Sequence, residues 1–306
     1  MSSRERSMVP PAKPTSYYGQ PVLKEPVWKW YIPAYFFAGG LSAGSTLLSA
    51  GAALAGDRRL ARRSRVASVA AVGVGAGLLV ADLGRPERFI NMLRVARPTS
   101  PMSMGTWLLT AYGPAAGVAA ATDLLGILPG VGTAAEIGAA ALAPAVATYT
   151  GVLVADTSVP VWHAARKELP ALFAAGAAAS AGGLALATGG PHQSPSARRL
   201  AVSGAVAEVA ITRIMKQRLG DLAEPYHQGR AGRLSKAAET LTVTGAALAA
   251  LSKKDRRWAG VAGGALIFAG AAVERFAVMA AGQQSARDPK YTVGPQRARV
   301  DAGGGT

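Results

Sequence analysis

The stretch LLVADLGRPERFINMLRVARPTSPMSMGTW, residues 78–107, decides the fold. An apolar run ends at Gly84, and a second apolar run opens at Ser103. The 18 residues between them include four arginines. Two apolar runs joined by a short basic segment are typical of helices that cross a membrane and are connected at its surface.

The residues at both edges of this basic segment favour helix ends. Gly84 can cap the first helix, and Pro86 prevents that helix from continuing. Ser100 can cap the second helix, with Pro101 in its first turn. The sequence therefore predicts a segment at the membrane surface, although a basic loop that only obeys membrane topology is the other interpretation. The polar side chains that it would present are Arg85, Glu87, Arg88, Asn91 and Arg94.

Composition indicates the class of protein. The chain has 306 residues, of which 50% are hydrophobic, 37 are glycine and none is cysteine. Abundant small residues suit helices that approach each other closely in lipid. The formal net charge of +16 would fit a nucleic-acid-binding protein, but the charges lie between the apolar runs instead of along one face. We therefore expect membrane loops and no nucleic-acid partner.

Eight apolar runs follow one another along the chain. Each has about 18–29 residues, close to the ~20 that cross a ~30 Å hydrocarbon core. Because backbone groups in lipid must bond internally, each run should be a helix. The sixth and seventh runs are the most polar, so an interfacial position is an alternative for them. The runs cover residues 28–56, 64–84, 103–126, 133–158, 169–188, 196–218, 235–252 and 257–281.

The sequence thus predicts an all-α integral membrane protein, a bundle of eight transmembrane helices over residues 28–282. A polar, proline-rich segment (1–27) precedes this domain, and a polar tail (283–306) follows it. Eight spans put both termini on one side, where lysine and arginine number 20 against 11 on the other side. This excess predicts cytoplasmic termini, although the first loop on the other side is itself strongly basic.

Histidine and cysteine usage limits the possible cofactors. A membrane cytochrome needs histidines inside facing helices, but His163, His192 and His227 all lie between the apolar runs. Without cysteine the chain has no thiolate to hold an iron–sulfur cluster. The sequence therefore predicts no haem, no iron–sulfur cluster and no metal site in this chain.

Acidic residues inside the apolar runs are costly in lipid and usually face the protein interior. Glu208 and Glu274 lie deepest, and Arg213 and Arg275 could neutralise them in structural ion pairs. The alternative is a relay through Glu208, Arg213, Glu239 and Glu274. Such a relay would make the chain a proton or ion transporter without redox partners.

Several separated motifs resemble the NrfD family, the membrane subunits of polysulfide-reductase-like complexes. The motifs are DLGRPERFINML, RPTSPMSMGTW, YTGVLV, LPALF and AGQQSARDPKYT, and they span residues 28–292. The resemblance implies a quinone-reactive anchor in the bacterial plasma membrane. It also implies a docked iron–sulfur, ferredoxin-like subunit that contacts a molybdenum or tungsten bis-pterin catalytic subunit. A purely structural anchor that binds no quinone remains the other interpretation.

The resemblance further implies a site for a quinone, expected to be menaquinone. Tyr149 matches the tyrosine that the family places in its quinone pocket, and it would donate a hydrogen bond to a quinone carbonyl. Asp156 follows two turns later on the same helix face and would pass protons. Tyr35 and Trp162 would wall the slot.

Two further candidates, Asp82 and Arg85, close the second helix on the same side as Tyr149. The segments expected to contact the iron–sulfur subunit also share that side. They are the loop Arg85–Ser100, the linker Trp162–Lys167 and the C-terminal tail.

Overall fold

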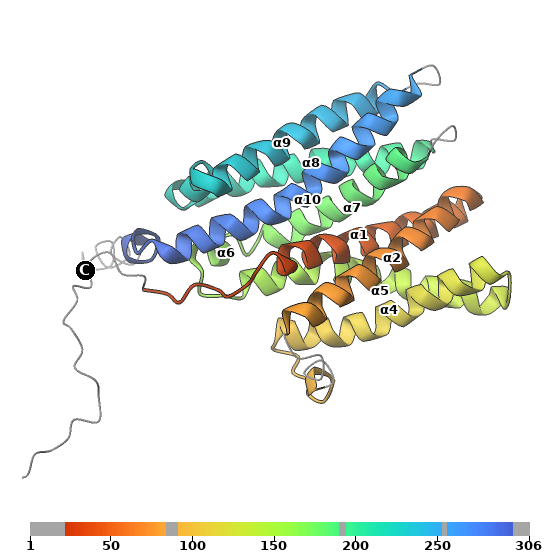
Figure 1. Cartoon of the computed structure of the whole chain (residues 1–306), viewed down its shortest axis with the longest axis horizontal. Helices are drawn as coiled ribbons and strands as arrows, with labels where there is room; N and C mark the ends of the chain where they lie inside the picture. Colours follow the sequence, from red (N-terminus) through yellow and green to blue (C-terminus); the bar gives the residue numbers. More distant parts are fainter. Residues whose placement is uncertain (1–21, 84–90, 190–193, 253–255, 296–306) are drawn as a thin grey trace, which may run out of the picture.

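The computed structural model describes residues 22–83, 91–189, 194–252 and 256–295. Within these ranges the chain forms eight long α-helices and no strand (Figure 1). The long helices are α1 (Tyr31–Leu54), α2 (Arg58–Asp82), α4 (Pro101–Leu125), α5 (Pro129–Ala155), α7 (Leu169–Thr188), α8 (Pro195–Leu219), α9 (Gly229–Ala250) and α10 (Arg257–Arg287). Shorter helices include α6 (Pro160–Ala164) and the 3-10 helix η1 (Gly220–Tyr226).

Six of the long helices in the described part of the chain are long and apolar enough to cross a membrane. The other two, α8 and α9, have similar lengths but more polar sequences. They correspond to the sixth and seventh apolar runs. Each packs along a helix of the apolar set, α8 on α7 and α9 on α10. The structure confirms the prediction of an all-α membrane protein built from a helical bundle.

Helix ends follow the local signals in the sequence. The backbone N–H of Ser103 donates to the Ser100 hydroxyl at 3.4 Å, which caps α4 as predicted. Gly126 adopts a left-handed conformation (φ 68°) after α4, and Pro129 then opens α5. The predicted stop after α2 agrees with its last residue, Asp82, whereas Gly84 and Pro86 lie outside the described residues.

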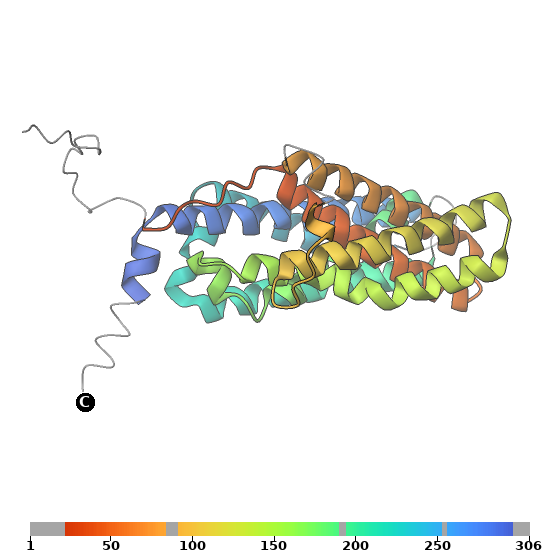
Figure 2. The ribbon, with the colours of Figure 1, turned by 90° about the horizontal axis from the view of Figure 1, so that it is seen from below.

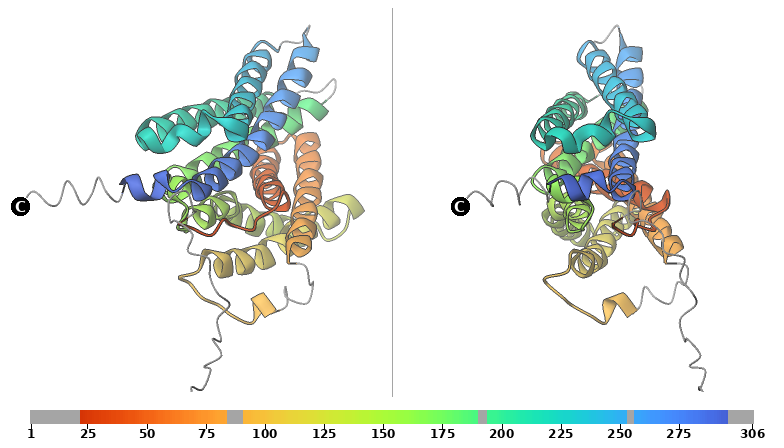
Figure 3. Two further views of the ribbon diagram at one scale, coloured as in Figure 1. Left: turned by 60° about the vertical axis from the view of Figure 1, so that its left-hand side comes forward. Right: turned by 90° about the vertical axis from the view of Figure 1, so that its left-hand side faces the viewer.

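The helices form two four-helix rings. The N-terminal bundle comprises α1, α2, α4 and α5, and the C-terminal bundle comprises α7, α8, α9 and α10. Within each bundle every helix packs on two neighbours, so that both rings close. Contacts of α7 with α1 and α5, and of α10 with α1, join the bundles (Figure 3).

The two ends of the molecule carry different connections. We call the end where α1 begins and α10 ends the terminal face; α6 and η1 also lie there. The opposite end is the hairpin face, which carries the short turns inside each helical hairpin. Residues 22–30, which we call the strap, run from α1 toward the end of α10 (Figure 2). Helix α10 continues to Arg287, so its last five residues belong to the predicted tail.

Candidate functional site

Two tyrosines from different helices meet near the terminal face. The hydroxyls of Tyr35 (α1) and Tyr149 (α5) are hydrogen-bonded to each other. Tyr35 is 5% exposed, and Tyr149 is partly buried. Two phenols carry two O–H groups, and only one of them is used in the bond between the pair. The second O–H can therefore donate to another acceptor placed beside the pair.

Glycines on the neighbouring helices make room for both rings. The ring of Tyr149 covers Gly105 of α4, where any side chain would overlap its carbons. The ring of Tyr35 lies against Gly75 of α2, 3.6 Å from the position that a Cβ atom would take there. The four helices of the N-terminal bundle therefore all contribute to the setting of the pair.

An aromatic cluster connects the pair to Trp28 of the strap. Tyr35 packs on Phe36, whose ring centre lies 6.3 Å from that of Trp28. Trp28 stacks on Trp162 at 5.5 Å. The indole N–H of the fully buried Trp162 donates to the Val278 carbonyl at 2.8 Å, which fixes α6 against α10. Trp162 thus belongs to the same apolar cluster as Tyr35, two rings away from it.

The strap is tied to the end of α10. The side-chain amide of Gln283 donates to the Trp28 carbonyl at 2.9 Å. Arg287 forms two hydrogen bonds with the Glu25 carboxylate, at 2.6 and 2.8 Å. These bonds lower the pKa of Glu25. Both described chain ends are therefore held together on the terminal face.

The predicted acidic residues lie apart from the tyrosine pair. Asp156 is exposed at the C-cap of α5, and Asp82 is partly buried at the end of α2. Both are at the terminal face, but neither side chain has a hydrogen bond or ion pair in the described structure. Arg85 lies outside the described residues.

The N-terminal bundle also holds a polar network that sequence reasoning missed. It contains four hydroxyl groups midway along the bundle and an acid–base cluster nearer the hairpin face. Its members are Ser42, Thr46, Ser49, Ser68, Tyr112, Glu136, Arg65 and Asp123. Hydroxyl residues repeated every seventh position of an apolar run are the signal that could have found it.

Two acids of the C-terminal bundle, Glu208 and Glu239, form separate ion pairs, whereas a carboxylate oxygen of the buried Glu274 has no hydrogen-bond partner in the described structure. Arg275 lies 4.0 Å from Glu208, and both are buried. The guanidinium of Arg275 donates to the Phe173 carbonyl and covers its ring at 4.1 Å. Arg213 instead pairs with Glu239 at 2.6 Å, with both side chains partly exposed. The structure therefore brings Glu208 to Arg275, as the ion-pair interpretation expects.

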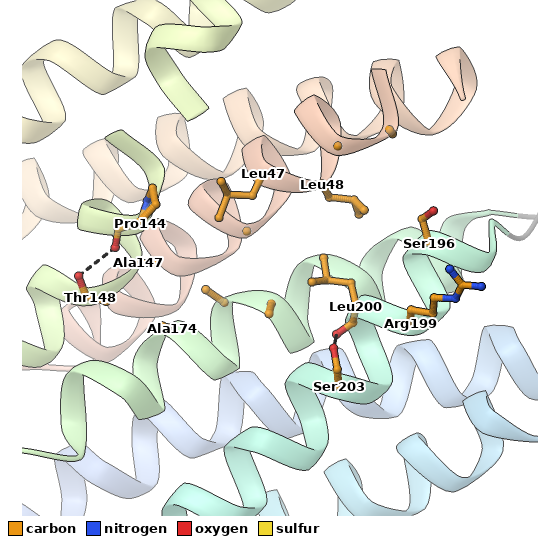
Figure 4. Close-up of a pocket in the computed structure, with 15 residues that line it drawn as sticks. Leu47, Leu48, Pro144, Ala147, Thr148, Ala174, Ser196, Arg199, Leu200 and Ser203 are labelled. Atoms are coloured by element: carbon orange, nitrogen blue, oxygen red, sulfur yellow. Dashed lines mark hydrogen bonds between the residues drawn. The ribbon is translucent and has the colours of Figure 1, made fainter. Parts of the chain in front are cut away.

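An apolar groove lies between the two bundles, and Thr148, which precedes Tyr149 on α5, is one of its lining residues. Its volume is about 570 Å³, and α1, α5, α7 and α8 line it (Figure 4). Leu47, Leu48 and Pro144 form part of the walls, with Arg199 at the end toward the hairpin face. Such walls suit a lipid or prenyl chain more than a polar headgroup.

A family model described as polysulphide reductase, NrfD, matches residues 20–189. The match covers more than half of the chain and includes the strap, the whole N-terminal bundle and α7. No curated protein matches the chain. The chain therefore belongs to the NrfD family, whose members are membrane subunits of redox complexes.

Proposed function

We propose that this chain passes electrons between a docked iron–sulfur subunit and a quinone of the membrane pool. The iron–sulfur subunit would in turn contact a molybdenum or tungsten bis-pterin catalytic subunit. The hydrogen-bonded hydroxyls of Tyr35 and Tyr149 are the observation that carries the proposal. Family membership supports the redox role.

The chemistry of a quinone fits this pair. Reduction of a quinone to a quinol takes up two electrons and two protons, and both carbonyl oxygens become hydroxyls. A carbonyl beside the pair would accept the free phenolic O–H of Tyr35 or Tyr149. The neighbouring apolar cluster of Phe36, Trp28 and Trp162 supplies the surface that a quinone ring requires.

The position of the pair suits a donor or acceptor cluster outside the membrane. Tyr35 lies four residues into α1, which is about 6 Å from the helix start at 1.5 Å per residue. Tyr149 lies six residues before the end of α5, about 9 Å from the terminal face. A quinone at the pair would therefore be close to a cluster docked on that face.

The terminal face is the proposed docking surface. It carries the strap, α6 with the linker to Lys167, residues 91–100 and the end of α10. The excess of lysine and arginine on this side supports a cytoplasmic terminal face. Menaquinone is the proposed species, and Asp156 is a candidate proton donor on the same face.

Replacement of one phenol tests the proposal. Tyr149→Phe should weaken quinone binding by about 0.5–1.5 kcal/mol, roughly three- to tenfold, because one neutral hydrogen bond is lost. Quinone-linked turnover should fall accordingly. Reduction of the partner cluster by an artificial donor should not change.

Tyr226→Phe is the matched control. Tyr226 is a fully buried tyrosine of η1, and its hydroxyl has no hydrogen-bond partner in the described structure. If Tyr149→Phe and Tyr226→Phe turn over quinone alike, the site lies elsewhere. A partner that copurifies without any quinone-linked activity would instead identify a purely structural anchor, and the absence of any iron–sulfur partner would favour a transporter.

A further inference from the structure

Polar side chains repeat every two turns through the N-terminal bundle. On α1, Tyr35, Ser42 and Ser49 follow at intervals of seven residues and so share one helix face. Tyr112 on α4 lies seven residues after Gly105, which the Tyr149 ring covers. The tyrosine pair is therefore the first of three polar layers that proceed toward the hairpin face.

The second layer is a cluster of four buried hydroxyls. The Tyr112 hydroxyl lies 2.8 Å from that of Ser42, 2.7 Å from that of Thr46 and 3.1 Å from that of Ser68. The Thr46 and Ser68 hydroxyls are 2.7 Å apart. Hydroxyls that both donate and accept can pass a proton along such a chain by exchanging their hydrogen bonds.

The third layer is a carboxylate held by a serine and an arginine. The Ser49 hydroxyl donates to Glu136 at 2.5 Å. Arg65 binds the same carboxylate through two N–H groups, at 3.0 and 2.5 Å. Arg65 also contacts Asp123 at 2.9 Å, and Arg62 lies beyond it at 3.8 Å. Glu136 is thus buried and charge-paired, not an exposed interfacial residue.

A small cavity joins the second and third layers. Thr46, Ser68, Ser49, Arg65 and Glu136 all line it, and its volume is about 10 Å³. A cavity of that size with several polar neighbours can hold one water molecule. One bridging water would connect the hydroxyl cluster to the carboxylate.

The third layer opens at the hairpin face. A polar pocket of about 250 Å³ lies between the ends of α2, α4 and α5. Arg65, Asp123, Glu136 and Thr133 line it. The carboxylate of Glu136 therefore lies between an inner cavity and a pocket at the membrane surface.

The first and second layers are two turns of α1 apart, about 10 Å along the helix axis. Gly39 lies between them on α1 and is buried. A side chain built at Gly39 would meet no atom of a neighbouring element within 4 Å. The space beside Gly39 is therefore not filled by a side chain of a neighbouring helix.

We propose that the protons of the quinone reaction travel along these layers to and from the hairpin face, in place of a route through Asp156 at the terminal face. This inference rests on the proposed quinone site at Tyr35 and Tyr149. When a quinol is oxidised there, two electrons leave to the cluster docked on the terminal face. Two protons leave through Tyr112, the bridging water and Glu136 to the opposite face. Each quinol then separates two charges across the membrane, so the reaction stores energy.

Sealed vesicles test the direction of proton release. The complex with its iron–sulfur partner is reconstituted, with pyranine trapped inside and valinomycin with potassium to collapse the voltage. The quinol of 2,3-dimethyl-1,4-naphthoquinone donates electrons, and external ferricyanide, which cannot enter, accepts them from outward-facing terminal faces. The vesicle interior should acidify by two protons per quinol above protein-free vesicles. Proton release only to the outside would overturn the inference.

Variants of the path give the second readout. Tyr112→Phe and Glu136→Gln should each slow interior acidification and quinol oxidation by on the order of tenfold to a hundredfold, because a positioned proton carrier is lost. Affinity for the quinone analogue should remain as in the wild type. If Glu136→Gln does not assemble, Thr46→Val, which removes no charge, is measured in its place. Ser180→Ala is the control, since its hydroxyl only bonds to Ala177 of its own helix.

The outcomes separate the path from the quinone site. If Tyr149→Phe slows turnover but the variants of the path do not, the path is wrong and the site stands. If Tyr149→Phe has no effect, the quinone site itself is wrong. If Glu208→Gln were the one variant that stopped interior acidification, the proton path would lie in the C-terminal bundle, and the inference would be overturned.

Discussion

The two bundles handle buried polarity in different ways. In the N-terminal bundle, the hydroxyls of Ser42, Thr46, Ser68 and Tyr112 bond to one another, and cavities border the acid Glu136. In the C-terminal bundle, both carboxylate oxygens of Glu208 and two nitrogens of Arg275 lack hydrogen-bond partners in the described structure.

The two bundles also differ in how closely their helices approach one another. Gly204 and Gly264 of the C-terminal bundle contact the backbone of facing helices directly, as small residues in lipid allow. In the N-terminal bundle, Gly105 and Gly75 face tyrosine rings. The comparison teaches that hydrogen-bonded polar layers accompany the half for which we propose the quinone reaction, whereas the other half packs its helices closely. The family model matches the N-terminal bundle entirely.

The largest expected effect is the loss of stability when the buried charge pair of the C-terminal bundle is broken. Arg275→Met should destabilise the protein by about 3–5 kcal/mol, because it leaves Glu208 without its counter-charge in a dry interior. Arg65→Met should destabilise the protein less, because Glu136 keeps its hydrogen bond from Ser49 and borders an open pocket. Denaturant unfolding of both variants in detergent measures the difference. Equal losses would contradict the comparison, and adding Glu208→Gln to Arg275→Met should restore part of the stability.

Close packing predicts the next effect. Gly204→Ala should destabilise by about 1–3 kcal/mol, because its methyl group would overlap the Ala179 backbone. Gly73→Ala is the matched control on α2, where a methyl group meets nothing within 4 Å. Thermal unfolding should show a lower midpoint for Gly204→Ala only. A tolerated Gly204→Ala would show that the C-terminal bundle is not tightly packed.

Local sequence signals predicted the helix ends well, because caps depend on a few neighbouring residues. Ser100, Pro101 and the stop after Asp82 are examples. The contact between Tyr35 and Tyr149 could not be predicted, since it depends on how α1 and α5 rotate against each other. The setting of Glu136 could not be predicted either, because Ser49 and Arg65, which bind its carboxylate, come from two other helices.

A smaller effect is expected at the glycine under the Tyr149 ring. Gly105→Ala should displace that ring and slow quinone-linked turnover up to about tenfold, equivalent to ~1.4 kcal/mol. Gly117→Ala on the same helix, where space is open, should leave turnover unchanged. Steady-state assays with the naphthoquinone analogue compare the two. Equal turnover rates for the two variants would contradict the placement of the quinone site in the N-terminal bundle.

The smallest expected effect is on the contact between Glu224 of η1 and Lys290 at the terminal face. Hydrogen bonding from Lys290 lowers the pKa of Glu224 in η1. A lowered carboxyl pKa stabilises this contact above the ordinary range of glutamate, and the contact weakens as pH falls through the lowered value. Protection of residues 288–293 against hydrogen exchange, expressed relative to the intrinsic exchange rate at each pH, should therefore fall in acid. Glu224→Gln should abolish that pH dependence, and an unchanged profile would contradict the assignment.

Locating the quinone directly tests the central claim. An azido-quinone is photolysed in the assembled complex, and labelled peptides are identified by mass spectrometry, with excess 2,3-dimethyl-1,4-naphthoquinone as competitor. Competable label should appear on α1 and α5 beside Tyr35 and Tyr149. Competable label confined to α7–α10 would contradict the account.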